Sequence, residues 1–200
     1  MLVVAFSIIL FLVFYFQNKI TEKDKAYEFL FELTGELQTK VNLYNQNFEI
    51  NNKMAGQKAP EITISGTKGD KSKFSLSDLI YKYPVLMYRF RYTDIYCASC
   101  YESEIKELQT EFSDTPELAC ILCSFNNDRD LTVLKKINVI ILNMYRIPFE
   151  AFDWDVEKNG KPYYFVLHPD MKISHIFVPN NKYPEYNKQY LKAVKSFLSE

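Results

Sequence analysis

The sequence has almost no net charge and few cysteines. Its 24 Lys and Arg residues are balanced by 25 Asp and Glu residues, for a formal net charge of -1 at pH 7. Without a positive excess there is no electrostatic basis for binding nucleic acid, so no nucleic-acid partner is expected. Four cysteines in 200 residues are too few for a disulfide-stapled scaffold, although they suffice for one redox pair or one zinc site.

Charged residues are also absent from the first sixteen positions, MLVVAFSIILFLVFYF, where only Ser7 is polar. As a helix this run would be about 24 Å long, against a hydrocarbon core of about 30 Å, and the residues that follow it can lie in the interface. No small residues of the A-x-A type follow the run, which argues against a cleaved signal peptide. We therefore predict an uncleaved membrane anchor over residues 1–19.

The side of the membrane on which the rest of the chain lies is less directly indicated. Lys19, Lys23 and Lys25 follow the apolar run and none precedes it, which by the positive-inside rule favours the cytoplasm. A long C-terminal domain can, however, cross a membrane whatever its charge, and disulfides persist outside the cytoplasm. We predict a single-pass membrane protein whose domain lies outside the cytoplasm, in a periplasmic or equivalent compartment.

Residues 20–53 are predicted to form a helical stalk. Apolar residues recur there every three or four positions, as on one face of a helix: Leu30, Leu33, Leu37, Val41, Tyr44 and Phe48. The stripe fits packing on the domain or on a second copy of the chain, and packing on the domain is the commoner fate. The oligomeric state does not follow from the sequence.

Residues 54–200 are predicted to form one α/β domain. The strand YPVLMYRFRY is followed by a helix from Cys97, whose inner face carries Tyr101, Ile105, Leu108 and Phe112 at spacings of 4, 3 and 4. The next segment, LACILCSF, is an apolar run typical of a strand covered on both faces. This βαβ order requires parallel strands and a right-handed crossover. A short helix over about 130–137 and another extended piece follow, and then PYYFVLHPDMKISHIFVP reads as a hairpin with its turn at His168. The chain continues into an amphipathic helix with Leu191, Val194, Phe197 and Leu198 expected to point inward.

Cys97 and Cys100 lie three positions apart where this strand gives way to the helix. The first turn of a helix presents unpaired N–H groups and the positive end of the helix dipole, both of which favour a thiolate. Cys97 is therefore predicted to be a nucleophile, and Cys100, one turn further on, to resolve a mixed disulfide formed at Cys97. A C-x-x-C motif within a βαβ unit indicates a redox role.

These segments resemble the redoxin branch of the thioredoxin-like superfamily, in particular membrane-anchored thiol–disulfide oxidoreductases of the TlpA and alkyl-hydroperoxide-reductase-like group. The resemblance spans roughly residues 56–200 and is carried by GQKAPEITI, GDKSKFSLSDLI, YPVLMYRFRYTDIYCASC and GKPYYFVLHPDMKI. It implies a thioredoxin-like fold, with a mixed central sheet of βαβ and ββα halves and helices on both faces. It also implies exchange with protein thiols and disulfides, without a metal or other cofactor. Pro162 matches the family's cis-proline, and Lys161 beside it would pair with an extended substrate peptide.

The sequence departs from this family around the cysteines. Ala98 and Ser99 separate them, where Gly-Pro or Pro-Pro is usual, and Ser103 stands where the family has a glutamate. A proton-handling role for Glu102 or Glu104 is open, but we favour exposed acids that stabilise the first turn of the helix.

Two alternative functions compete with exchange. A thiol peroxidase is disfavoured because Phe90 and Asp94 replace the proline and threonine of the peroxidase motif. A non-catalytic tethered binding protein could keep the same fold. In that case the acidic, aromatic stretch over residues 150–157 could form a docking lip, although we favour a solvated loop with Trp154 folded inward.

Cys120 and Cys123 form a second C-x-x-C pair, at a spacing from the first pair that is near that of known zinc sites. Because they lie in a strand-like run, their side chains should point to opposite faces of the sheet. We therefore predict two small buried apolar residues that neither chelate a metal nor form a disulfide. His168 and His175 have no predicted partner and are expected at the surface.

Overall fold

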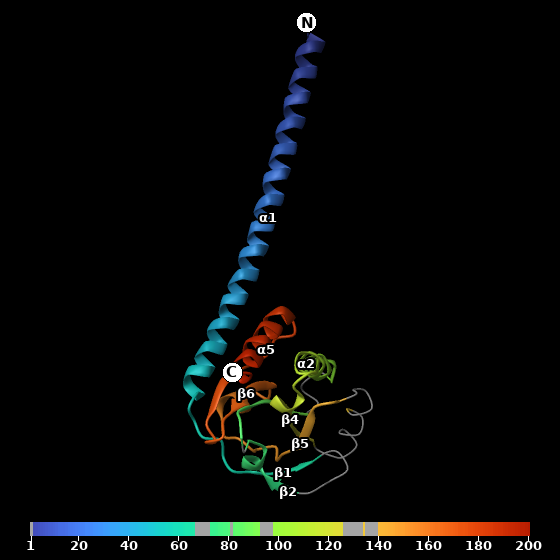
Figure 1. The fold of residues 1–200 in the computed structure, drawn as a ribbon. Coiled ribbons are helices and arrows are strands. Elements are labelled where there is room, and N and C mark those ends of the chain that lie inside the picture. The colour runs from blue at the N-terminus through green and yellow to red at the C-terminus, as the bar shows by residue number, and fades with distance from the viewer. Residues whose placement is uncertain (1, 67–72, 81, 93–97, 126–133, 135–139) are drawn as a thin grey trace. The chain divides into compact units, whose positions relative to one another are not determined.

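The computed structural model describes residues 2–66, 73–80, 82–92, 98–125, 134 and 140–200, and for residues 2–10, 12 and 98–100 the backbone alone. The chain divides into two units, Met1–Gln46 and Asn47–Glu200. One long helix, α1 (Leu2–Met54), makes up the first unit, and its last residues, 47–54, belong to the second (Figure 1). The predicted helical stalk is thus part of one continuous helix, with no break near residue 19.

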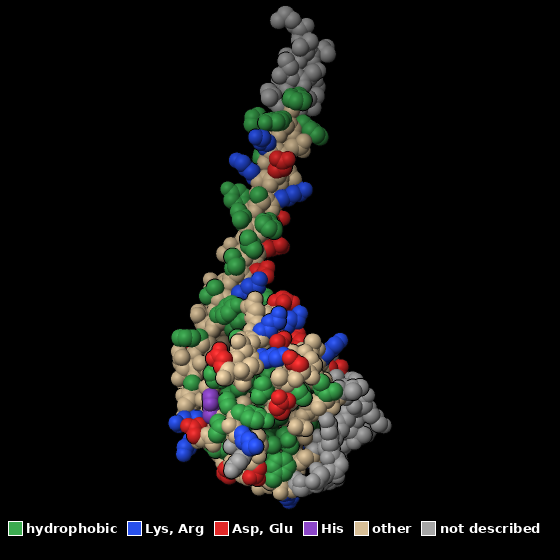
Figure 2. Space-filling view, in the orientation of Figure 1, with side chains coloured by type: hydrophobic (Ala, Val, Ile, Leu, Met, Phe, Trp, Pro, Cys, Tyr) green, Lys and Arg blue, Asp and Glu red, His purple; other side chains and the backbone are tan. Residues whose placement is uncertain are grey.

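The apolar stripe of α1 is solvent-exposed. The side chains of Leu30, Leu33, Leu37, Val41, Tyr44 and Phe48 are 40–67% exposed, and apolar side chains are visible along the helix in Figure 2. Among the residues that the structure describes, no helix combines the length and apolar character needed to cross a membrane. Most of the side chains of the predicted anchor lie outside the described residues, so the anchor and the partner of the stripe stay predictions.

The described residues of the second unit form a seven-stranded mixed sheet in the order β2-β1-β5-β4-β3-β6-β7. The three central strands, β3, β4 and β5, are parallel, and β1, β6 and β7 join through antiparallel pairs. The strands are β1 (Thr63–Gly66), β2 (Lys73–Ser75), β3 (Val85–Arg91), β4 (Ala119–Ser124), β5 (Asn143–Arg146), β6 (Tyr163–Leu167) and β7 (Ile173–Phe177). The predicted parallel pairing and the final hairpin are both confirmed.

Helices cover one face of the sheet. Helix α2 (Ala98–Glu111) and helix α5 (Pro184–Leu198) pack there (Figure 1). The predicted inner side chains, Tyr101, Ile105, Leu108 and Phe112, are fully buried. In α5, Leu191 and Val194 are buried as predicted. Phe197, predicted to point inward, is 38% exposed and lies against the ring of His175.

Shorter elements cover the other face. They are the 3-10 helix η1 (Leu76–Ile80), the segment that leads into α4 (Asp155–Lys158), and the end of α1 from Asn47, with Met54 in the core. A second 3-10 helix, η2 (Pro116–Leu118), precedes β4. The helix predicted over residues 130–137 falls almost wholly outside the described residues.

The two cysteines of β4 behave as predicted. Cys120 packs in the core on one face of the sheet, where its Sγ lies 2.9 Å from Met87 Sδ, whereas Cys123 packs in the core on the opposite face. Both are free thiols, and burial raises the pKa of the Cys120 thiol. Neither can act as a redox partner for the other in this arrangement.

Leu108→Ala tests how far the domain depends on the buried face of α2. Because the Leu108 side chain is fully buried, we expect its truncation to lower the free energy of unfolding by about 2–5 kcal/mol. Lys106→Ala on the exposed face of the same helix should change it by less than about 0.5 kcal/mol. Urea unfolding of the whole chain measures both, and equal midpoints for the two variants would contradict this packing.

Candidate functional site

The four residues predicted for the site come from two segments. Cys97 lies outside the described residues, and Cys100 lies in the first turn of α2, with only its backbone described. Lys161 is exposed and Pro162 is buried, and both directly precede β6. The backbone therefore confirms the predicted position of Cys100 at the start of a helix.

Strand pairing brings the two segments to the same end of the sheet. β6 runs antiparallel to β3, with Arg89 opposite Tyr163 and Val85 opposite Leu167. Pro162 therefore lies beside the end of β3 from which the chain leads through Cys97 into α2. The C-terminal ends of the parallel strands β4 and β5 lie at this end of the sheet as well.

The peptide bond before Pro162 differs from the one that the resemblance implied. No peptide bond among the described residues is cis, so the bond between Lys161 and Pro162 is trans. Two residues before Pro162, Gly160 has a φ of +67°, in the left-handed region that glycine adopts without a steric penalty. The substrate-binding roles of Lys161 and Pro162 stay predictions.

A buried arginine, which the sequence analysis did not single out, lies at this end of the sheet. Arg89 is fully buried in β3. Its five N–H donors have five acceptor contacts, which is the full capacity of a guanidinium group. The acceptors are Glu157 Oε1 (twice, at 3.1 and 2.6 Å), the Phe90 carbonyl (2.9 Å), Ser124 Oγ (2.7 Å) and the Phe149 carbonyl (3.1 Å). This one side chain thus joins the ends of β3 and β4 to α4 and to the segment after β5.

Glu157, the ion-pair partner of Arg89, is 4% exposed. Its second oxygen accepts a hydrogen bond from the Tyr163 hydroxyl at 2.7 Å. Burial, followed by the charge of Glu157 and this hydrogen bond, raises the pKa of Tyr163 well above its usual value. Arg91 adds a bond from its Nη2 to the Glu157 carbonyl. The sequence signal for such a partner was the presence of Arg89 and Arg91 in a strand whose other residues are apolar or aromatic.

In the acidic, aromatic stretch over residues 150–157 the two aromatic side chains are internal, whereas Glu150, Asp153 and Asp155 are exposed. Phe152 and Trp154 are 3% and 5% exposed and stack with their ring centroids 4.3 Å apart. The inward orientation of Trp154 is confirmed. The expected solvated loop is wrong for its last part, because residues from Asp155 form helix α4 and Glu157 turns into the core to meet Arg89.

The acids of α2 also differ from expectation. Glu104 is fully buried and accepts a hydrogen bond from the Tyr88 hydroxyl, whereas Glu102 is half-buried. The interpretation of both as exposed acids is therefore wrong for Glu104, because the face of α2 that carries Tyr101, Ile105 and Leu108 is wide enough to include it. Tyr101 donates from its hydroxyl to the Arg91 carbonyl at 2.6 Å, which ties the start of α2 to the end of β3.

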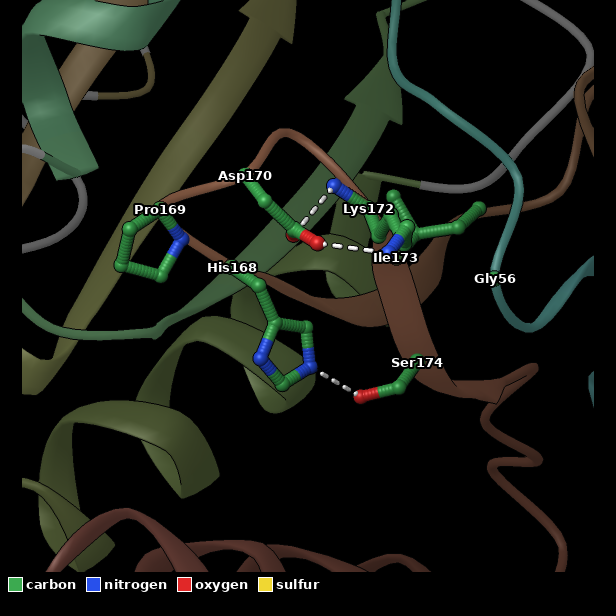
Figure 3. A pocket seen from close by; sticks show the side chains of 7 residues that line it. All are labelled: Gly56, His168, Pro169, Asp170, Lys172, Ile173 and Ser174. Atoms are coloured by element: carbon green, nitrogen blue, oxygen red, sulfur yellow. Dashed lines mark hydrogen bonds and ion pairs between the residues drawn. The ribbon is translucent and has the colours of Figure 1, made fainter.

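Two hollows lie at opposite ends of the sheet. One, of about 350 Å³, lies at the C-terminal ends of β4 and β5, where Phe125, Arg146 and Pro148 line it together with Ile64 and Lys73. The other, of about 460 Å³, lies at the turn between β6 and β7, between His168 and Ser174, with Gly56 beside it (Figure 3). The second hollow therefore lies at the end of the sheet opposite to the backbone of Cys100.

The two histidines beside this second hollow are not isolated surface residues, as the sequence had suggested. Ser174 Oγ lies 2.7 Å from His168 Nε2 and 2.7 Å from His175 Nδ1, and Figure 3 shows His168 directed at Ser174. His175 has a φ of +53°, unusual for a residue with a side chain. Its ring lies 4.4 Å from that of Phe197, and its carbonyl accepts the Tyr190 hydroxyl at 2.5 Å.

A parallel β3–β4 pair connected through α2, followed by an antiparallel β6–β7 hairpin and α5, is the thioredoxin-like fold. The predicted fold is thereby confirmed. Comparison of the sequence with protein-family models and with curated proteins found no match.

Solved structures with the same fold include a thiol:disulfide interchange protein from a Bacteroides species, at 17% identity and a TM-score of 0.55, over 73% of this chain and 91% of that one. They also include the thioredoxin domain of a thiol-disulfide oxidoreductase from Bacteroides vulgatus, at 18% identity and a TM-score of 0.51, over 72% of this chain and 97% of that one. At these sequence identities the likeness concerns the fold alone.

The cluster of His168, Ser174 and His175 should make stability depend on pH. Burial, and secondarily the charge of His168, lowers the pKa of His175 from its usual 6.5, so the folded protein binds this proton more weakly than the unfolded chain does. The stabilisation is fully present above about pH 6.5 and is lost as the pH falls through the lower folded pKa. In His175→Asn, which tolerates a positive φ, the drop in Tm between about pH 7.5 and about pH 5 should be smaller than in the wild type.

Lys172→Gln in the same hairpin is the matched control. Lys172 pairs with Asp170 at 2.8 Å, and neither group titrates within this pH window. This variant should keep the wild-type pH dependence. If His175→Asn loses as much stability on acidification as the wild type, the assignment of the effect to His175 is wrong.

Proposed function

We propose that the protein is a thiol–disulfide oxidoreductase that exchanges disulfides with protein substrates through Cys97 and Cys100. The observation that carries this proposal is a C-x-x-C motif at the start of a helix that follows a parallel strand of a thioredoxin-like fold. Thiol:disulfide interchange proteins are among the solved structures with this fold. The start of the helix favours the thiolate that exchange requires.

In the reducing direction the Cys97 thiolate attacks one sulfur of a substrate disulfide. That S–S bond breaks, a mixed disulfide forms, and the released substrate thiolate takes up a proton. The Cys100 thiolate then attacks the Cys97 sulfur and releases the second substrate thiolate. The substrate gains two electrons, and the dithiol becomes a disulfide that a thiol partner must reduce again. Oxidation of a substrate dithiol follows the same steps in reverse.

We assign substrate binding to the segment before β6. Lys161 is exposed and lies beside the end of β3, and we infer that an extended peptide pairs with its backbone as an added strand. The docking lip of the binding-protein alternative keeps only its exposed acids, Glu150, Asp153 and Asp155, because Phe152, Trp154 and Glu157 are buried. The sequence argument against a thiol peroxidase, based on Phe90 and Asp94, is unchanged.

The proposal includes a location. We assign a single-pass membrane anchor to residues 1–19 and place the domain outside the cytoplasm. The uncharged run over residues 1–16 supports the anchor. The need for a compartment in which disulfides persist supports the side.

Single cysteine variants test the exchange reaction. Cys97→Ser should abolish formation of a mixed disulfide with a protein substrate, because the attacking thiolate is gone. Cys100→Ser should accumulate that mixed disulfide, because no resolving thiol is left. Non-reducing gel electrophoresis and mass spectrometry of trapped adducts measure both. Equal residual turnover in the two variants would exclude the proposed roles.

Reporter fusions test the location. A phosphatase that is active only outside the cytoplasm is fused after Lys25 and, separately, after Glu200. We expect activity at both positions, because a long C-terminal domain can be translocated despite the lysines at its start. A cytoplasmic reporter at the same positions is the matched control. Inactive phosphatase with an active cytoplasmic reporter at both positions would reverse the assigned orientation.

A further inference from the structure

The carboxylate of Glu157 contacts two strands through its two oxygens. Oε1 accepts hydrogen bonds from Arg89 Nε and Nη2 at 3.1 and 2.6 Å, and Oε2 accepts one from the Tyr163 hydroxyl at 2.7 Å. Arg89 belongs to β3, the strand that leads toward Cys97, and Tyr163 directly follows Pro162. One buried carboxylate therefore spans the strand before the dithiol and the segment to which we assign substrate binding.

A second set of contacts continues from Glu157 to α2. Arg91 donates from its side chain to the Glu157 carbonyl, and the Arg91 carbonyl accepts the Tyr101 hydroxyl at 2.6 Å. Tyr101 directly follows Cys100. The end of β3 is thus held between α4 and α2 by groups that adjoin both segments of the candidate site.

Stability alone does not account for such a pair. Removing a guanidinium and a carboxylate from water is costly, and an apolar pair of similar volume is often at least as stable. An apolar pair cannot, however, direct bonds of fixed length to two different strands. Glu157 bonds to Arg89 of β3 and to Tyr163 of β6, and such bonds to two strands are what a positioning residue requires.

We propose that Glu157 and Tyr163 are positioning residues that hold the Lys161–Pro162 segment in place relative to the dithiol. An extended peptide bound at Lys161 then presents its disulfide to Cys97. This inference rests on the proposed function, because it requires Cys97 to exchange with a peptide disulfide. The proposed role predicts that the reactivity of the Cys97 thiolate and the alignment of a bound peptide can be changed separately. A small alkylating reagent needs only the Cys97 thiolate, whereas an extended peptide also needs the aligned segment.

Tyr163→Phe in the whole chain tests this role. The change removes one hydroxyl and leaves the ion pair between Arg89 and Glu157 intact. Two rates are measured for the reduced protein: alkylation of Cys97 by iodoacetamide, followed by mass spectrometry, and exchange with an extended peptide disulfide. We expect the exchange rate to fall by about ten- to a hundredfold, while the alkylation rate and its pH profile stay at wild-type values.

Two further variants sharpen the result. Glu157→Asp keeps the charge that Arg89 requires but shortens the side chain by one methylene group, so it should lower the exchange rate without changing alkylation. Tyr190→Phe is the matched control. It removes another internal tyrosine hydroxyl, which donates to the His175 carbonyl, and should leave both rates unchanged.

The outcomes distinguish the positioning role from the proposed exchange function on which it rests. An exchange rate in Tyr163→Phe equal to that of the wild type, or a parallel fall in both of its rates, would overturn the positioning role. A wild-type chain that is alkylated at Cys97 but does not exchange with the peptide would instead overturn the proposed function.

Discussion

The burial of the Arg89 guanidinium is the constraint on which this end of the molecule depends. A buried cation is tolerated only with a paired charge and a partner for each donor, and all five donors of Arg89 are used. The partners come from segments far apart in the chain, including Ser124, Phe149 and Glu157. The hydrogen bonds that Arg89 requires therefore fix where β4 ends and where the chain runs after β5. They also explain why α4 turns toward the sheet.

The same constraint distinguishes the two ends of the sheet. At the end that adjoins Cys100 and Pro162, a network of charged and hydroxyl groups joins β3, β6, α2 and α4. At the other end, the turn at His168 is closed by backbone bonds and by the shared hydroxyl of Ser174. Directed side-chain contacts are thus concentrated at the end of the sheet to which we assign the exchange reaction. The surface in view carries interspersed charges of both signs (Figure 2).

Local patterns in the sequence were sufficient for β3, α2, β4, the β6–β7 hairpin and α5, and for the place of Cys100 in the first turn of α2, but not for α4. Apolar spacing predicted the buried face of α2, and alternation within a strand separated Cys120 from Cys123. Contacts between distant residues were not accessible in this way. Arg89 and Glu157 lie 68 positions apart, and no period links them. The approach of His168 and His175 to one hydroxyl depends on an irregular register between β6 and β7, which no spacing rule specifies.

Glu104 and Glu157, which were both expected to be solvent-exposed, are bound by successive residues of β3. Side chains alternate between the faces of a strand, so Tyr88 and Arg89 point to opposite faces of the sheet. Tyr88 donates to Glu104 of α2 on one face, and Arg89 pairs with Glu157 of α4 on the other. A shift of one residue in β3 would place both polar groups against the wrong partners. Two buried carboxylates, one on each face, therefore fix the register of the strand that leads toward Cys97.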